Sequence, residues 1–181
     1  EKLSFHNVVI FNLYEYYPLA KENVNSSFSQ LKSLLLDHIN IDKQNIFTPD
    51  GTIPQENVMD YCRLYEERIQ QMGGLDIVVM GIGREGNIAM NEPGSQLSST
   101  TRLILTDATS KAEAAHNLGI EVLPPCSITM GVATIMSAKR VFLLAWGDEK
   151  ADIIKKALED KITETLPASY IQLHNNASVC I

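Results

Sequence analysis

The fold of this chain is decided by the stretch Asp76-Ile-Val-Val-Met-Gly-Ile-Gly-Arg-Glu-Gly-Asn-Ile-Ala-Met-Asn-Glu-Pro-Gly94. Its first part, residues 77–80, is a continuous apolar run, which predicts a strand buried on both faces of a parallel sheet. Gly81, Gly83 and Gly86 then interrupt the run within a few residues. Because open α/β sheets bind their ligands where such strands end, the turn after this strand is the first candidate site.

The glycine-rich turn carries the polar side chains of Arg84, Glu85, Asn87, Asn91 and Glu92. Two carboxylates that lie close together can move each other's pKa values apart, so that one group holds a proton and the other does not. Such a pair can move protons between adjacent carbons of a sugar. The alternative is an ordinary strand-to-loop connection whose charges face water.

Outward from this turn, apolar runs alternate with segments of helical periodicity. We expect strands at 7–13, 102–106, 140–147 and from 179, a strand or turn at 127–131, and a turn at 14–18. We expect helices at 25–39, 54–72, from Thr109, at 132–138 and at 148–159, the last capped by Asp148. Alternating strands and helices predict an α/β fold: a mainly parallel sheet with helices on both faces, a Rossmann-like three-layer sandwich. We see no internal repeat and no linker, so we expect residues 1–181 to form a single domain.

Composition limits the function classes. The chain has 181 residues, 45% of them hydrophobic, and a formal net charge of −7. An acidic surface argues against non-specific binding of nucleic acid or of an anionic membrane. The apolar runs are too short to span a bilayer, and residue 1 onward does not have the pattern that we would expect of a signal peptide. We therefore expect a cytoplasmic protein and, because the chain begins with Glu1, a piece of a longer one.

The three cysteines, Cys62, Cys126 and Cys180, are far apart in the sequence, and no histidine stands at metal-ligand spacing from any of them. Three reduced thiols are the simplest interpretation. We expect no metal site and no cofactor.

The turn, and nearly the whole chain, resembles the glucosamine-6-phosphate deaminases. Their motif reads Gly-Xaa-Gly-Xaa-Asp-Gly-His-Ile-Ala-Phe-Asn-Glu-Pro, and this chain has Gly81-Ile-Gly-Arg-Glu-Gly-Asn-Ile-Ala-Met-Asn-Glu-Pro93. The resemblance implies an enzyme of amino-sugar catabolism that converts glucosamine 6-phosphate to fructose 6-phosphate and ammonia by aldose–ketose isomerisation and deamination. Its partner would be a small sugar phosphate. Strands that the family has and this chain lacks would leave open sheet edges, which favour a homo-oligomer.

The departures from the family pattern fall on its acid–base residues. Asn87 stands where the family has histidine, Tyr14 of Tyr14-Glu15-Tyr16 where it has aspartate, and Glu85 where the turn has aspartate; Glu92 matches. Asparagine only hydrogen-bonds, and a phenol titrates near a pKa of ~10. In one hypothesis the chemistry is rerouted: Glu85 or Glu15 acts as base, Tyr14 donates a proton and Asn87 holds the ring oxygen. In the other, the site binds a sugar phosphate without turnover.

The substrate would be held by Gly83, Arg84 and Gly86 on the turn and by Lys150 in Gly147-Asp-Glu-Lys150, the family's phosphate-binding position. Helix N-termini favour phosphate, which suits a lysine at the start of a helix. Two alternatives to the deaminase hypothesis stay open. One is a non-catalytic sugar-phosphate-binding or regulatory domain. The other is a 6-phosphogluconolactonase-like hydrolase, a family of the same fold whose turn usually lacks Asn-Glu-Pro.

Overall fold

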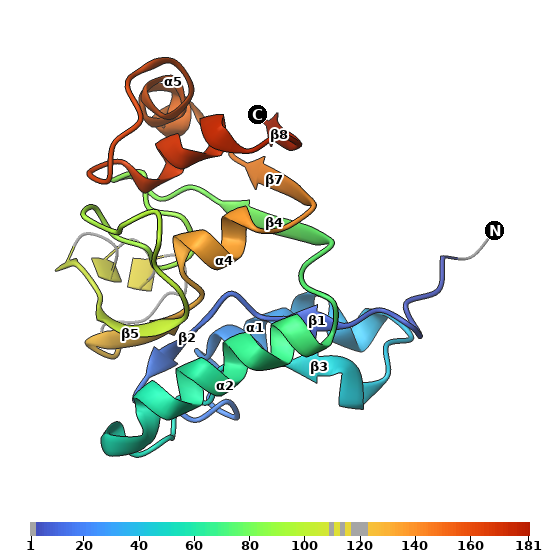
Figure 1. Ribbon diagram of the computed structural model, residues 1–181. Helices are drawn as coiled ribbons and strands as arrows, with labels where there is room; N and C mark the ends of the chain where they lie inside the picture. Colours follow the sequence, from blue (N-terminus) through green and yellow to red (C-terminus); the bar gives the residue numbers. More distant parts are fainter. Residues whose placement is uncertain (1–2, 109–110, 113–114, 117–122) are drawn as a thin grey trace.

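The computed structural model describes residues 3–108, 111–112, 115–116 and 123–181. Its strands form three small sheets with the orders β1-β3, β2-β6-β5 and β4-β7-β8, and helices pack around them (Figure 1). Strands are parallel in the first and third sheets and antiparallel in the second. The fold is therefore mixed α/β, and the expected mainly parallel sheet is wrong for the part that β2, β5 and β6 build.

The sheet that carries the glycine-rich turn consists of β4 (Ile77–Gly81), β7 (Arg140–Leu144) and β8 (Ala177–Cys180). β4 and β7 are parallel, and Gly81 at the end of β4 lies opposite Leu144 at the end of β7. The turns that follow these two strands therefore leave the same edge of the sheet. This is the edge at which the sequence predicted a site.

Strand β4 is not buried on both faces as expected. Val78 and Met80 are buried, whereas Ile77 and Val79 remain 58% and 55% exposed. Helices α2, α4 and α5 contribute to the core that covers the first pair. The second pair faces an apolar groove of about 690 Å³ that Phe5, residues 7–11 and Leu13 also line. One face of this sheet is therefore open in the described part of the chain.

The antiparallel sheet consists of β2 (Tyr14–Tyr17), β5 (Arg102–Leu105) and β6 (Cys126–Thr129). Tyr14 lies opposite Thr129 in the register. The expected turn at 14–18 is wrong, because aromatic residues favour the pleated surface and the strand runs up to Pro18. The expected strand at 7–13 is reduced to β1 (Ile10–Phe11), which pairs in parallel with β3 (Ile46–Phe47).

The helices are α1 (Ser27–Leu34), α2 (Val58–Gln71), α4 (Val132–Met136) and α5 (Ala151–Glu159), with 3-10 turns at Leu36–His38, Lys43–Asn45, Gln55–Asn57, Asp148–Lys150 and Pro167–Leu173. Helix α2 has the expected stripe, with Val58, Cys62, Tyr65 and Ile69 buried. Helix α1 is shorter than expected, and Leu34 at its end is 78% exposed.

Two capping predictions have different outcomes. Asp148 makes no side-chain cap, since it starts the 3-10 turn and Lys150 is the N-cap residue of α5. The expected cap at Thr109 lies outside the described residues, although residues 108, 111–112 and 115–116 are helical.

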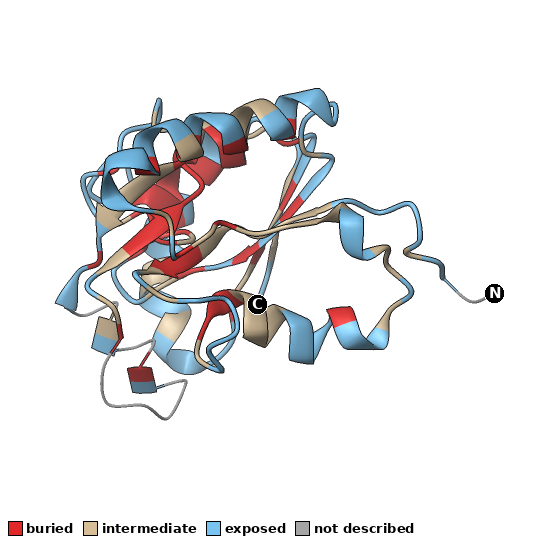
Figure 2. Cartoon of the chain, turned by 90° about the horizontal axis from the view of Figure 1, so that it is seen from below, coloured by how far each residue is buried: buried red, intermediate tan, exposed pale blue. Residues whose placement is uncertain are grey.

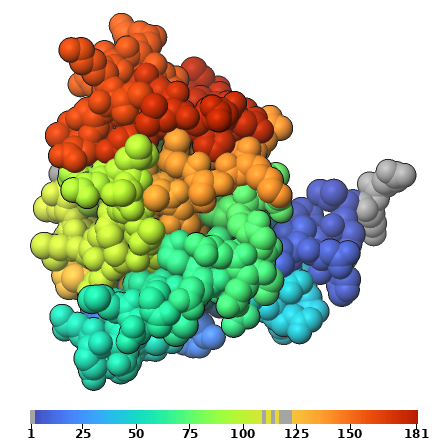
Figure 3. All heavy atoms as spheres, viewed as in Figure 1, coloured from blue at the N-terminus to red at the C-terminus, as the bar shows by residue number. Residues whose placement is uncertain are grey.

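The core lies between the sheets and the inward sides of the helices. Figure 2 shows the buried residues gathered there, and Figure 3 shows the C-terminal third forming the top of the visible face while the N-terminal arm projects from its side. Ile88 of the glycine-rich turn and Met130 after β6 belong to the main cluster. The turn is thus anchored in the core. No helix in the described part of the chain is long and apolar enough to cross a membrane.

Candidate active site

The turn after β4 is a tight backbone structure that its glycines permit. Gly83 N–H donates to Asn87 O at 2.9 Å, and Gly86 N–H donates to Gly83 O at 3.0 Å. Gly86 has φ of +75°, a conformation that side chains disfavour. A Cβ at position 83 would lie 1.8 Å from Asn87 Oδ1. Glycine at 83 therefore makes room for the Asn87 amide.

Asn87 lies in this turn with an unused acceptor. Its side chain is 8% exposed, and its Nδ2 donates to Ala89 O at 3.4 Å. Among the buried side-chain nitrogen and oxygen atoms of the described residues, Asn87 Oδ1 is the one without a hydrogen-bond partner. An unpaired buried oxygen costs free energy, about 1–3 kcal/mol in typical proteins. A ligand that donates a hydrogen bond to Asn87 would remove this cost.

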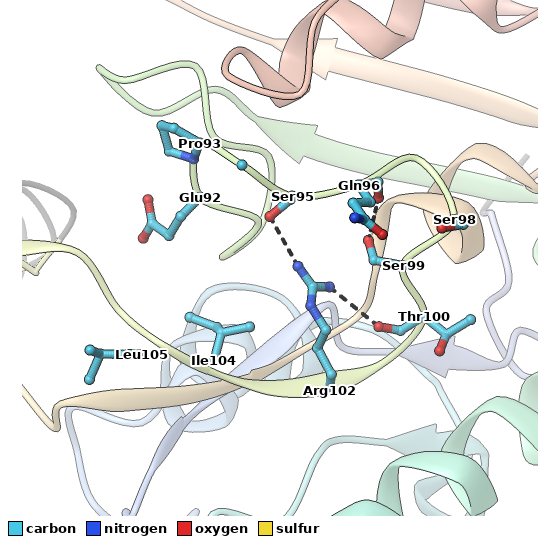
Figure 4. Close-up of a pocket in the computed structure, with 11 residues that line it drawn as sticks. Glu92, Pro93, Ser95, Gln96, Ser98, Ser99, Thr100, Arg102, Ile104 and Leu105 are labelled. Carbon is cyan, nitrogen blue, oxygen red and sulfur yellow. Dashed lines mark hydrogen bonds between the residues drawn. The ribbon is translucent and has the colours of Figure 1, made fainter.

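The two carboxylates of the turn have different environments. Glu85, like Arg84, is exposed. Glu92 is half-buried, and its Oε1 accepts from Asp107 N–H at 3.4 Å. Glu92 lines a pocket of about 640 Å³ between the loop 93–100 and strand β5 (Figure 4). Glu92 is thus positioned beside a space that a small molecule can enter.

Tyr14 is brought to the turn by the antiparallel sheet. Its partner Thr129 accepts a hydrogen bond from Met90 N–H at 3.2 Å through Oγ1, and Met130 N–H donates to Leu13 O at 2.7 Å. Burial raises the pKa of the Tyr14 phenol above its ordinary value, with hydrogen bonds to Tyr16 and Ser27 opposing the rise. Near neutral pH Tyr14 therefore holds its proton and can donate it in a hydrogen bond.

Glu15 serves a structural purpose in this geometry. It is fully buried, and its carboxylate accepts from the backbone N–H groups of Tyr16, Ser27 and Phe28 at 2.8–2.9 Å. Ser27 and Phe28 begin helix α1, whose first N–H groups have no partner within the helix. Burial raises the pKa of Glu15, and the three N–H donors oppose that rise. Glu15 thus ties β2 to the start of α1.

Lys150 lies in the turn after β7, the strand next to β4, but it does not line the pocket that Glu92 lines. It is half-buried and borders a space of about 520 Å³ with Trp146, one side of α5 and Ile181. That space does not include Glu92. The structure therefore brings Tyr14, Asn87 and Glu92 to the region around one turn, with Lys150 on the second turn at the same sheet edge.

Three residues with no role in the expected site lie in this region. Asn91 is fully buried, and Arg102 and Ser95 line the Glu92 pocket and hydrogen-bond each other. The Asn-Glu-Pro motif could have indicated Asn91, because a polar residue between Met90 and Glu92 needs partners. No group of three or more His, Cys, Asp and Glu side chains in the described ranges could hold a metal ion.

Comparison with known proteins shows which family the chain belongs to. The model of the glucosamine-6-phosphate isomerases and 6-phosphogluconolactonases matches residues 2–180. The chain belongs to this family. Among its relatives, a glucosamine-6-phosphate deaminase-like protein of Bacteroides thetaiotaomicron is 61% identical over 182 residues. That match covers 100% of this chain and 28% of the relative, so the chain spans little more than a quarter of that protein's length.

Two deaminases match over more of their length. The glucosamine-6-phosphate deaminase of Shewanella woodyi is 46% identical over 99% of this chain and 67% of its own length. The one of Halalkalibacterium halodurans is 40% identical over 97% of this chain and 71% of its own length.

Solved structures agree with this family. A monomeric glucosamine-6-phosphate deaminase of the NagB superfamily superposes with a TM-score of 0.93 at 34% identity, over 99% of this chain and 74% of that one. The 6-phosphogluconolactonase of Thermotoga maritima gives 0.75 at 19% identity, over 99% and 74%. The second similarity concerns the fold alone.

Proposed function

We propose that the protein is a glucosamine-6-phosphate deaminase, which converts glucosamine 6-phosphate and water to fructose 6-phosphate and ammonia. The observation that carries this proposal is the turn after β4, where the unpaired Asn87 Oδ1 and the pocket-lining Glu92 lie on one short segment. Relatives with that activity, at 40–46% identity, support it. The test is ammonia release from glucosamine 6-phosphate by the full-length protein.

The proton transfers of the reaction fall to the carboxylates of the turn. Ring opening gives the aldehyde at C1. Moving the C2 proton to C1 and a proton from the amine nitrogen to O1 then converts the aldehyde to an alcohol and the amine at C2 to an imine. Water then hydrolyses the imine to the ketone and ammonia. Glu92 and Glu85 handle the protons, because they are the carboxylates of the turn.

The remaining groups of the turn hold the substrate. Asn87 Oδ1 accepts a hydrogen bond from a substrate hydroxyl, and the Tyr14 phenol donates a hydrogen bond to a substrate oxygen. Gly83 and Gly86 keep the backbone close to the ligand, and Arg84 adds a cation at the exposed rim. The reaction needs no metal and no cofactor.

Lys150 would bind the phosphate, since it lies at the start of α5. We expect Lys150→Ala to weaken binding of glucosamine 6-phosphate about 10- to 100-fold, the usual worth of a hydrogen bond to a charged group. Plain glucosamine should bind equally to both forms. Calorimetry with the two sugars measures the difference, with Lys161→Ala, an exposed lysine beyond α5, as control. Equal losses for the two sugars would remove Lys150 from the phosphate site.

A non-catalytic sugar-phosphate-binding domain is the second candidate. The raised pKa of Tyr14 favours it, because neither Tyr14 nor Asn87 then exchanges a proton near neutral pH. In this case the wild type binds glucosamine 6-phosphate without releasing ammonia. The double substitution Tyr14→Asp, Asn87→His should then introduce ammonia release, because both new groups titrate below pH 8. If the wild type releases ammonia and the double variant is slower, this candidate is excluded.

We place the protein in the cytoplasm, acting on a small sugar phosphate in amino-sugar metabolism, with residues 1–181 as one domain. The open apolar face at Ile77 and Val79 suits a further layer, which would complete a Rossmann-like three-layer sandwich, or a second copy of the chain. For 6-phosphogluconolactonase-like hydrolysis the support is the shared family model and a similarity of fold.

A further inference from the structure

We propose that Arg102 is a positioning residue that holds the Glu92 loop in its working conformation; this inference rests on the proposed function. Arg102 is the first residue of β5 and lies half-buried under the loop 91–100. Its guanidinium bonds to the chain on both sides of Glu92.

The guanidinium spans the loop with separate nitrogens. Nη1 donates to Asn91 Oδ1 at 2.9 Å and to Thr100 O at 3.3 Å, while Nη2 donates to Ser95 Oγ at 3.0 Å. Figure 4 shows the guanidinium between Ser95 and Thr100, on the floor of the pocket that Glu92 lines. Asn91 precedes Glu92 and Ser95 follows it by three residues. A planar group with several donors in fixed directions is suited to such a bridge, whereas a lysine reaches one side only.

Asn91 and Ser95, the two loop residues that Arg102 connects, are themselves hydrogen-bonded to other parts of the chain. Asn91 is fully buried, and its Nδ2 donates to Ile88 O at 3.0 Å and to Met130 O at 2.9 Å. Ser95 N–H donates to Glu92 O at 3.0 Å, and Tyr170 Oη donates to Ser95 O at 3.3 Å. The backbone of Glu92 therefore has few directions in which it can move while Arg102 is bound.

Arg102 itself starts from a rigid position. Its neighbour Thr101 donates to Glu66 Oε1 of helix α2 through its backbone N–H at 2.7 Å and also through its hydroxyl. Thr134 Oγ1 of α4 donates to the same oxygen at 2.7 Å. Helix α2, helix α4 and strand β5 thus meet at one carboxylate. Arg102 lies next to this junction, so its backbone is held in place by the core while its guanidinium binds the loop.

A group that acts only by placing Glu92 has a specific kinetic signature. Loss of Arg102 should lower kcat and leave KM for glucosamine 6-phosphate unchanged. Because displacements of about 1 Å can cost on the order of a hundredfold in rate, we expect Arg102→Gln to lower kcat about 10- to 100-fold. Arg102→Lys keeps one of the two connections and should fall between Gln and the wild type.

The experiment is a double-mutant cycle between Arg102→Gln and Glu92→Gln in the full-length protein, with ammonia measured over long incubations. If Arg102 acts through Glu92, Arg102→Gln should cause no further loss in the Glu92→Gln background. Arg63→Gln is the control, since Arg63 pairs with Asp60 and Glu67 on the exposed side of α2. An equal loss in both backgrounds, or a raised KM with unchanged kcat, would overturn the inference.

Hydrogen exchange tests the loop without turnover. The N–H groups of Asn91 and Ser95 bond to Ile88 O and Glu92 O within the loop. Their exchange should be faster in Arg102→Gln by about tenfold or more, as expected when a stabilising contact of ~1.4 kcal/mol is lost, and unchanged in Arg63→Gln. Unchanged exchange in Arg102→Gln would overturn the inference. A wild type that binds no sugar phosphate and releases no ammonia would overturn the proposed function, and the exchange result would still decide whether Arg102 holds the loop.

Discussion

Glu92→Gln should reduce ammonia release from glucosamine 6-phosphate by about a hundred- to ten-thousand-fold, the usual cost of removing an acid–base group. Glutamine has nearly the same shape and keeps an oxygen that can accept from Asp107 N–H, so the loop should stay in place. What it loses is the capacity to take and return a proton. Because Glu92 lines the pocket while Glu85 is exposed, we expect Glu85→Gln to have the smaller effect.

The measurement is kcat for ammonia release at saturating sugar phosphate, with KM determined in parallel. Glu22→Gln serves as the control, because Glu22 is exposed in the loop before α1. The wild type, Glu92→Gln and Glu22→Gln should unfold at the same temperature, which separates a loss of catalysis from a loss of fold. A Glu92→Gln protein with wild-type kcat would exclude Glu92 from proton handling.

Glu15→Ala should lower the free energy of unfolding by about 3 kcal/mol. The carboxylate accepts three backbone N–H groups, two of them at the start of α1, and alanine leaves these donors buried without partners. Each unsatisfied donor costs about 1–3 kcal/mol, and the loss of a helix N-cap alone costs about 1 kcal/mol. Relief from burying a charge returns part of this sum.

Urea unfolding followed by circular dichroism measures the change. Glu15→Gln should be less harmful than Glu15→Ala, since the amide oxygen still accepts while its NH₂ group faces donors. Glu22→Ala, at an exposed position, provides the baseline. If Glu15→Ala unfolds at the wild-type urea concentration, the carboxylate does not anchor α1. In that case Glu15 would again be a candidate base for the reaction.

Local pattern predicted part of the fold. The strands β4 and β7 and helix α2 follow from apolar runs and helical spacing, because each is long and regular enough to show its period. The antiparallel pairing of β2 with β6 could not be predicted. It depends on residues 14–17 meeting residues 126–129, and nothing within either segment identifies its partner. The exposed sides of Ile77 and Val79 were missed for the same reason, since covering one face is a property of the surroundings.

The candidate site was predicted where one segment contains it. The turn 81–93 carries its own motif, and the structure places Asn87 and Glu92 as a buried acceptor and a pocket-lining carboxylate. Their catalytic roles remain predictions. Glu15 was a candidate base in the rerouted hypothesis, and only the position of α1 reveals the two N–H donors that Ser27 and Phe28 supply to it. Arg102 gave no signal of a bridge, because its partners Asn91 and Ser95 lie in a loop without periodic pattern.

The pairing of Tyr14 with Thr129 and the hydrogen bond from Asn91 to Met130 join parts of the chain that are distant in sequence. Helix α2 can form from neighbouring residues, but bringing Tyr14 to the glycine-rich turn requires the closure of a loop that includes most of the chain. Partly folded molecules would therefore keep much of their helix content and bind no sugar. Ligand affinity and the global folding equilibrium are linked, so that a saturating sugar phosphate protects the entire chain against unfolding and proteolysis, including segments that never touch it.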